Sequence, residues 1–206
     1  VQGRLIYFDG DDNLNQIVAH LRRDIVPFSY NTPNYVVRDG ITYLITKKGE
    51  VALKVFGEHN LQNIEAARLA CRQIGVTDDQ FYSVIGNFPG ASNRLQKIVE
   101  TKKAIAFKDF AHSPSKLKAT VNAVKSQYPD RRLIACMELH TFSSLTEDFL
   151  PQYYSCMEKA DVAFVYYNPE VIQHKRLKDL SPDQVKKEFG GNNVEVFTDS
   201  ALLQAA

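Results

Sequence analysis

Hydrophobic and polar positions are patterned differently in the two halves of the chain. In the first half, short runs rich in β-branched and aromatic residues predict a strand over residues 4–8 and further strands within 25–56. Apolar residues at helical spacing predict a helix over 13–23. Asp39-Gly40 is a typical hairpin turn, so we expect residues 25–56 to form an antiparallel meander attached to an α/β core.

A longer amphipathic helix is predicted over residues 58–74, with Gly75 as its natural end. A second helix is expected over 77–86. The run Phe88-Pro89-Gly90 then breaks the helical pattern. We therefore predict two domains, residues 1–90 and residues 91–206.

The second half alternates regularly between apolar runs of strand length and amphipathic runs of helix length. This alternation predicts a Rossmann-like domain with a mainly parallel sheet and helices on its faces. The expected strands are 104–110, 131–139, 161–167 and 193–197, and the expected helices are 113–128, 147–159, 181–189 and one from Thr198.

Composition narrows the class of protein. The chain has 206 residues, 44% of them hydrophobic and 24% charged, with a formal net charge of +1. This balance gives no reason to expect nucleic acid or membrane as a partner, and no apolar run approaches the ~20 residues of a membrane span. Cys71, Cys136 and Cys156 form no CxxC pair, so we expect buried or partly buried free thiols in a reducing, cytoplasmic compartment. The missing initiator Met suggests a piece of a longer protein.

The first candidate site lies at the start of the 58–74 helix. Gly57 permits close backbone approach to a ligand, and His59, Asn60 and Asn63 follow it. Asn60 and Asn63 are three residues apart and share one helix face, where two carboxamides can read the donor and acceptor edges of a purine. The same spacing also fits a helix cap with a solvated surface residue, and the spacing alone does not separate the two interpretations.

The second candidate site lies where the 104–110 strand passes into the 113–128 helix. Asp109 and His112 stand at the carboxyl end of a strand, which is where open parallel sheets bind ligands. Ser113 fits an N-cap and Pro114 the first helical position, and the free N–H groups there favour an anion. Asp109 is suited to accept hydrogen bonds from ribose hydroxyls. A well-capped helix with nothing bound is the alternative.

A third polar loop, residues 138–144, follows the next strand and should emerge at the same edge as Asp109. It contains His140, Thr141 and Ser143. The chain contains no G-x-x-x-x-G-K-[ST] sequence, so a nucleoside triphosphate site built from these residues alone would lack its phosphate-binding loop.

Taken together, these segments resemble the Mur ligase family, ATP-dependent enzymes that build the peptide of peptidoglycan. The resemblance covers nearly the whole chain, with Asn93 in place of one expected arginine. The matching positions are Gly57, His59, Asn60 and Asn63 for G-x-H-N-x-x-N, Phe88, Gly90 and Arg94 for F-x-G-x-x-R-R, and Asp109, Phe110, Ala111, His112 and Pro114 for D-[YF]-[AG]-H-x-P.

The resemblance implies that residues 1–90 are the back part of an ATP-binding central domain and 91–206 a C-terminal ligase domain that stops short of its final strands. It also implies ATP and Mg²⁺, with a muramyl carboxylate activated as an acyl phosphate and attacked by an amine. The implied nucleotide-binding residues are His59, Asn60, Asn63, Arg94 and Asp109, the catalytic residue is His112, and the substrate-binding residues are Phe110, His140, Thr141 and Ser143. No metal ligands are expected within the chain.

Within the family, the chain looks closest to the ligases that act on UDP-N-acetylmuramate. The L-alanine-adding members carry two loop arginines where this chain has Thr141 and Ser144, and a hydroxyl does not replace an arginine that pairs with a carboxylate. This difference favours a ligase that adds L-alanyl-γ-D-glutamyl-meso-diaminopimelate. The L-alanine ligase and a non-catalytic nucleotide-binding module are the alternatives. Because the phosphate loop is absent, we expect the isolated chain to be inactive.

Overall fold

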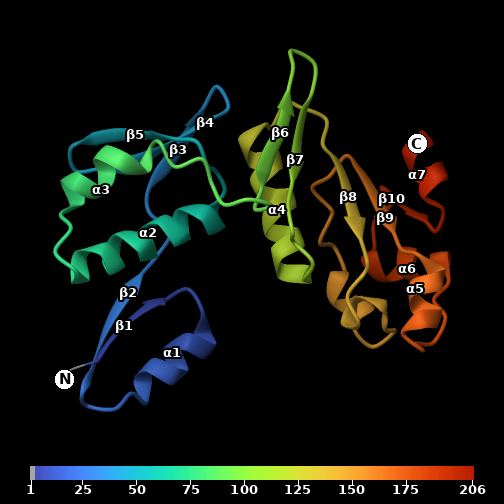
Figure 1. Ribbon diagram of the computed structural model, residues 1–206, viewed down its shortest axis with the longest axis horizontal. Helices are drawn as coiled ribbons and strands as arrows, with labels where there is room; N and C mark the ends of the chain where they lie inside the picture. Colours follow the sequence, from blue (N-terminus) through green and yellow to red (C-terminus); the bar gives the residue numbers. More distant parts are fainter. Residues whose placement is uncertain (1–2) are drawn as a thin grey trace. The chain divides into compact units, whose positions relative to one another are not determined.

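The computed structural model describes residues 3–206, which form two compact units, one up to Gly90 and one from Ala91 onward (Figure 1). Each unit combines helices with strands, so the predicted α/β architecture is confirmed. Within residues 3–206, no helix is both long enough and apolar enough to cross a membrane.

The first unit begins with a parallel pair of strands. β1 (Gly3–Phe8) pairs with β2 (Ile25–Tyr30) in parallel, from Gly3 opposite Ile25 to Phe8 opposite Tyr30. The prediction that residues 25–56 form one antiparallel meander is therefore wrong for β2. The cause is α1 (Asp12–Ala19), because a helix between two strands of one sheet returns the chain in the same direction.

The antiparallel meander begins only at Tyr35. β3 (Tyr35–Arg38), β4 (Ile41–Thr46) and β5 (Gly49–Leu53) pair in that order. Asp39 and Gly40 have φ values of 51° and 71°, the left-handed pair that a two-residue hairpin turn needs to match the twist of its strands. The predicted hairpin at Asp39-Gly40 is confirmed.

Two helices pack on this meander. α2 (Glu58–Gln73) and α3 (Asp78–Ile85) bury their apolar side chains against β4 and β5, with Leu61 fully excluded from solvent. The predicted helices over 58–74 and 77–86 are confirmed within a residue or two. The core residues of this unit are Leu44, Leu53, Val55, Leu61, Ile64 and Phe81.

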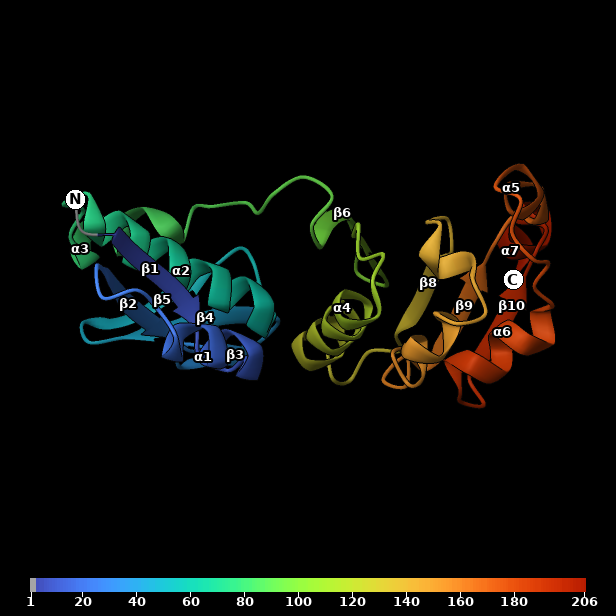
Figure 2. The ribbon, with the colours of Figure 1, turned by 90° about the horizontal axis from the view of Figure 1, so that it is seen from below.

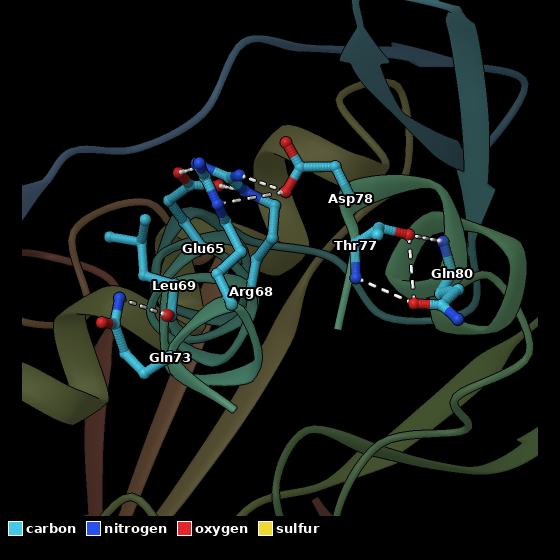
Figure 3. A network of polar contacts seen from close by, with 8 residues as sticks. Glu65, Arg68, Leu69, Gln73, Thr77, Asp78 and Gln80 are labelled. Atoms are coloured by element: carbon cyan, nitrogen blue, oxygen red, sulfur yellow. Dashed lines mark hydrogen bonds and ion pairs between the residues drawn. The ribbon is translucent and has the colours of Figure 1, made fainter. Parts of the chain in front are cut away.

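A polar network fixes how α3 follows α2 (Figure 3). The Arg68 guanidinium donates to Glu65 within α2 and, at 2.7 Å, to Oδ1 of Asp78 in the first turn of α3. The hydrogen bond with Glu65 raises the pKa of Arg68 and so keeps the guanidinium charged. Thr77 and Gln80 form a reciprocal capping box that satisfies donors at the start of α3.

The second unit contains two separate groups of strands (Figure 2). One is an antiparallel ribbon, and the other is a parallel sheet in the order β10-β9-β8. The ribbon consists of β6 (Gln96–Glu100) and β7 (Ile105–Lys108), and the sheet of β8 (Ile134–Glu138), β9 (Val162–Tyr166) and β10 (Val194–Phe197). The helices are α4 (Pro114–Gln127), α5 (Pro169–His174), α6 (Pro182–Phe189) and α7 (Ser200–Ala205). Neither β6 nor α5 follows from the sequence pattern above. The prediction that the 104–110 strand joins the parallel sheet is wrong, because β7 pairs with β6 in an antiparallel ribbon.

The predicted helix over 147–159 is wrong. This segment instead contains the second of two short 3-10 turns, η1 (Ser143–Leu145) and η2 (Leu150–Tyr153). Pro151 lacks the N–H that would continue a helix through this region. Ser155 then adopts a left-handed φ of 57°, which ends any helical continuation.

A cleft of about 1080 Å³ separates the ribbon from the parallel sheet. In the described chain, β7 forms a strand ladder only with β6 and β8 only with β9, so no ladder bridges the cleft that both strands line. Leu117 and Val121 of α4 line the cleft and also belong to the main core beneath β8–β10. α4 therefore links the ribbon to the sheet through apolar packing.

Replacing Arg68 with methionine should destabilise the first unit. The Arg68 side chain is only 13% exposed and Glu65 17%, so the substitution leaves the shielded Glu65 carboxylate without its cation. We expect the free energy of unfolding to fall by about 1–3 kcal/mol. Urea unfolding followed through amide NMR signals of α2 and α3 measures this change.

Arg72→Met is the matched control, because Arg72 is 54% exposed and lies 3.9 Å from Asp78. It should change the free energy of unfolding by no more than about 0.5 kcal/mol. Equal effects of the two substitutions would contradict the structural importance of the Arg68 network.

Candidate functional site

Four of the predicted site residues meet beyond the carboxyl ends of β7 and β8. The ring of Phe110 lies 5.0 Å from the His112 ring and 6.2 Å from the His140 ring, measured between centroids. Cζ of Arg94 lies 5.9 Å from the centroid of the same Phe110 ring. Phe110, His112 and His140 also line the end of the cleft. We call Arg94, Phe110, His112 and His140 the ring cluster.

Asp109 lies beside the ring cluster and also lines the cleft. Its Oδ2 atom accepts a 2.9 Å hydrogen bond from Oγ1 of Thr120 in α4. The bond fixes the rotamer of the half-buried carboxylate at the end of β7. Thr120 was not identified from the sequence. The sequence feature that could have identified Thr120 is its position on the apolar side of an amphipathic helix, next to Val121 and three residues from Leu117. A hydroxyl at such a position indicates a hydrogen-bond partner within the fold.

Both histidines of the ring cluster are oriented by backbone carbonyls. Nδ1 of His112 lies 3.0 Å from the Phe110 oxygen, and Nδ1 of His140 lies 3.3 Å from the Glu138 oxygen. A carbonyl oxygen can only accept a hydrogen bond, so these contacts assign the proton of each neutral ring to Nδ1. The Nε2 atom of each neutral ring then carries the lone pair.

The backbone of the His112 loop is tied to the core by Tyr153. The Tyr153 hydroxyl donates a 2.7 Å hydrogen bond to the His112 carbonyl oxygen, and its fully buried ring stacks on Phe189 at 4.9 Å. Burial raises the pKa of Tyr153 to about 12. No sequence signal identified Tyr153, because the contact joins residues 41 positions apart.

α4 begins as the sequence predicts, with Ser113 at the N-cap position and Pro114 in the first turn. Ser113 has an extended backbone, but its hydroxyl makes no capping bond among the described residues. The side chain therefore does not satisfy the first-turn N–H groups of α4, which are the groups that attract an anion at a helix start.

Thr141 and Ser143 are not brought to the cleft lining in the described chain. Thr141 instead shapes its own loop: its Oγ1 accepts from the Ser144 N–H at 3.2 Å, and the Ser144 hydroxyl donates to its carbonyl at 3.1 Å. Ser144 is 1% exposed. The hydroxyls that replace the expected arginines therefore stabilise the turn after β8.

In the first unit, His59, Asn60 and Asn63 lie in the first turns of α2. Gly57 is the N-cap with a φ of 87°, a conformation that side chains disfavour. The Asn60 carboxamide donates a 2.9 Å hydrogen bond to the Phe56 carbonyl, so Asn60 helps to fix the junction between β5 and α2. Asn63 is exposed, and His59 is half-buried.

The cysteines differ in their surroundings. All three are free thiols, with Cys156 buried, Cys71 partly buried and Cys136 exposed. The expectation of burial is wrong for Cys136, because it lies on the open edge of β8 and lines the cleft. The surrounding walls of the cleft keep part of the water away from the Cys136 sulfur, and this partial desolvation, with a smaller contribution from Glu138, raises the pKa of its thiol. Residues 3–206 contain no group of three or more His, Cys, Asp or Glu side chains that could hold a metal ion.

Tyr153→Phe should lower stability and change its pH dependence. The substitution removes the hydroxyl that donates to the His112 carbonyl, at an expected cost of about 1–2 kcal/mol. The pKa of Tyr153 is about 12 in the folded chain and about 10 in the unfolded chain, so folding favours the neutral phenol. The resulting contribution to the free energy of unfolding is complete below about pH 10 and is lost as the pH rises toward about 12. Urea unfolding at pH 8 to 11 should show a shallower alkaline decline in the variant.

Tyr154→Phe provides the control, since the Tyr154 side chain is 67% exposed. It should keep both the stability and the alkaline decline of the parent chain. An unchanged alkaline decline in Tyr153→Phe would contradict the raised pKa.

A family model described as "Mur ligase, glutamate ligase domain" matches residues 93–206. A UDP-N-acetylmuramate–L-alanine ligase of Chlorobium luteolum is 30% identical over 221 aligned residues, covering 99% of this chain and 46% of that protein. A ligase of the same name from Desulfitobacterium hafniense is 33% identical over 116 residues, covering 56% of this chain and 26% of that protein. The chain thus spans less than half the length of the relatives it matches.

Solved structures share the fold at low sequence identity. MurF from Acinetobacter baumannii matches with a TM-score of 0.71 and 16% identity, covering 99% of this chain and 44% of that one. The UDP-N-acetylmuramate-alanine ligase MurC of Thermotoga maritima matches with a TM-score of 0.68 and 15% identity, covering 98% and 44%. MurF ligase from Thermotoga maritima, solved in complex with ADP, matches at 0.65 and 14%, covering 95% and 44%.

Proposed function

Because the chain belongs to the Mur ligase family, we propose that it forms the C-terminal half of an ATP-dependent peptide ligase of peptidoglycan synthesis or recycling. In this proposal, residues 1–90 belong to the ATP-binding central domain and 91–206 to the ligase domain. The observation that carries the proposal is the convergence of Asp109, Arg94 and two oriented histidines at the carboxyl edge of β7 and β8. Of these two strands, β8 belongs to the parallel sheet, and the carboxyl ends of such strands are where α/β sheets usually bind ligands.

The nucleotide-binding residues would act through hydrogen bonds and charge. Asp109, held by Thr120, would accept hydrogen bonds from the ribose hydroxyls. Arg94 would pair with an anionic group of the nucleotide while its guanidinium rests over Phe110. His59, Asn60 and Asn63 would contact the adenine, although Asn60 has only its carboxamide oxygen and one N–H left beyond its bond to Phe56.

The catalytic role is assigned to His112. Its Nδ1–H is committed to the Phe110 carbonyl, so the neutral ring presents the Nε2 lone pair. That lone pair could take a proton from an attacking amine, which must lose one as the new amide forms. His140, in the same tautomer, would orient the amine substrate at the end of the cleft together with Phe110. Thr141 and Ser143 would act by shaping the loop that carries His140.

ATP, as co-substrate, would supply the phosphoryl group that activates the carboxylate of UDP-N-acetylmuramate. Mg²⁺ is the metal expected of such a ligase, but residues 3–206 hold no cluster of side chains that fits it. The metal is therefore assigned to no residue in this part of the chain.

We propose L-alanyl-γ-D-glutamyl-meso-diaminopimelate as the amine substrate. Thr141 and Ser144 place hydroxyls, bonded to each other's backbone, where a small amino acid's carboxylate would need cations. The name shared by the Chlorobium and Desulfitobacterium relatives favours L-alanine as the second candidate.

Acceptor profiling tests this assignment. A ligase that carries this chain, given ATP and UDP-N-acetylmuramate, should release ADP and phosphate with the tripeptide at a kcat/KM at least about tenfold above that with L-alanine. The 206-residue chain alone should release neither under the same conditions, because it contains no phosphate-binding loop. Preference for L-alanine would overturn the tripeptide assignment, and ATP-dependent ligation by the isolated chain would overturn its expected inactivity.

Thr120→Val should raise the KM for ATP in such a ligase by about three- to tenfold, because the Asp109 carboxylate loses the donor that orients it. Thr120→Ser keeps the hydroxyl and should retain the parent KM. Steady-state kinetics with ATP as the varied substrate measures both. Equal KM values for the valine and parent enzymes would remove Asp109 from the nucleotide site.

A further inference from the structure

Arg94 stands between two residues with left-handed backbones. Asn93 has a φ of 55° and Leu95 a φ of 46°. Only five non-glycine residues in the described part of the chain have a positive φ. Asparagine tolerates this conformation better than most residues, whereas leucine adopts it rarely. Two such residues around one arginine show that the surrounding structure dictates this backbone.

Specific contacts hold the segment in this conformation. The Asn93 N–H donates to Oε1 of Gln96 at 3.0 Å, and the Arg94 N–H donates to the Ala91 carbonyl at 3.2 Å. Leu95 is 8% exposed and contributes to the lining of the cleft. Burial of the leucine side chain opposes any relaxation of the turn, because relaxation would return that side chain to water.

The same segment is joined to the loop that carries Asp109 and His112. The Phe110 N–H donates a 2.9 Å hydrogen bond to the Asn93 carbonyl oxygen. The direction of that carbonyl depends on the Asn93 backbone angles. A change of φ at Asn93 would therefore move the acceptor away from Phe110 and swing Arg94 away from the Phe110 ring.

We propose that Asn93 is a positioning residue of this site. Its left-handed backbone directs Arg94 toward the Phe110 ring. Its carbonyl holds the Asp109–His112 loop by accepting a hydrogen bond from the Phe110 N–H. The effect on ligation rests on the proposed function, whereas the effect on the loop does not. Asparagine stands at position 93, where the family pattern has an arginine, because it tolerates the left-handed conformation needed there. In this role its side chain need not contact a substrate.

Two substitutions at Asn93 separate backbone conformation from side-chain chemistry. Asn93→Gly removes the carboxamide but adopts a positive φ readily, whereas Asn93→Val disfavours a positive φ strongly. The first readout is amide hydrogen exchange of Phe110 in the 206-residue chain, measured by NMR. The glycine variant should retain protection of this N–H, and in the valine variant exchange should be about tenfold faster.

Asn87→Val is the control for the substitution itself, because Asn87 is exposed and has no left-handed backbone. It should leave Phe110 exchange unchanged. Amide spectra of β8–β10 report whether the valine variant at position 93 remains folded. Parent-like protection of Phe110 in a folded Asn93→Val variant, or equal loss of protection in the glycine variant, would overturn the proposal.

The second readout distinguishes this inference from the proposed function. In a ligase that carries the chain, Asn93→Val should raise the KM for ATP, and Asn93→Gly should restore it to near the parent value. If exchange at Phe110 responds as expected while both variants keep the parent KM and kcat, the positioning by Asn93 stands and the nucleotide role of Arg94 is overturned.

Discussion

The second unit depends on a hydrogen bond between a buried tyrosine and a loop carbonyl. No strand ladder joins the β6–β7 ribbon to the β8–β10 sheet in the described chain. The Tyr153 hydroxyl, anchored in the core by stacking on Phe189, reaches the His112 carbonyl and fixes the ribbon side of the site to the sheet side. The apolar face of α4 adds attachment through Leu117 and Val121, and Lys125 of α4 forms a 2.9 Å ion pair with Asp161. Burial makes the bond effective, because a phenol without an acceptor in the core would be costly.

Backbone carbonyl groups orient the side chains of the site more than other side chains do. The imidazoles of His112 and His140 are each oriented by a carbonyl two residues earlier, and the loop of His112 is held at Phe110 by the Asn93 carbonyl. The Asp109 carboxylate differs, because it is oriented by a side chain, that of Thr120. Orientation by the main chain leaves side-chain atoms available for a ligand, as the proposed function requires.

Local rules in the sequence predicted much of the fold. Turn chemistry at Asp39-Gly40 and helical periodicity in α2 and α4 identified elements that the structure confirms. β6 was missed because every one of its residues is exposed, so it has no alternation between a buried and a solvated face. The direction of β2 depends on its long-range pairing with β1, and periodicity carries no information about pairing.

The candidate site is likewise predicted in part: local rules identified some of its residues and missed those that act through long-range contacts. The rule that ligands bind at strand ends grouped Asp109, His112 and His140, and all three line the cleft. They do not share the edge of one parallel sheet, because β7 pairs with β6 in a separate antiparallel ribbon. Thr120 and Tyr153 were missed because they act over 11 and 41 residues of separation. Thr141 and Ser143, which are expected to bind substrate, lie outside the cleft lining in the described chain, and Thr141 bonds with Ser144 within the turn. Local hydroxyl-to-backbone bonds compete for such residues, and spacing alone does not show which use prevails.

The separation of the second unit into the β6–β7 ribbon and the β8–β10 sheet also affects the order in which its parts fold. The β6–β7 ribbon is closed by a short turn in which Thr101 bonds to the Ala104 backbone, so its contacts are local in sequence. The β8–β10 sheet is parallel, and each of its pairings must wait for an intervening crossover to close. We therefore expect the ribbon to form early and the parallel sheet late, with docking of Tyr153 against the His112 loop completing the site. The order of assembly would then make the binding edge the last part of this unit to become native.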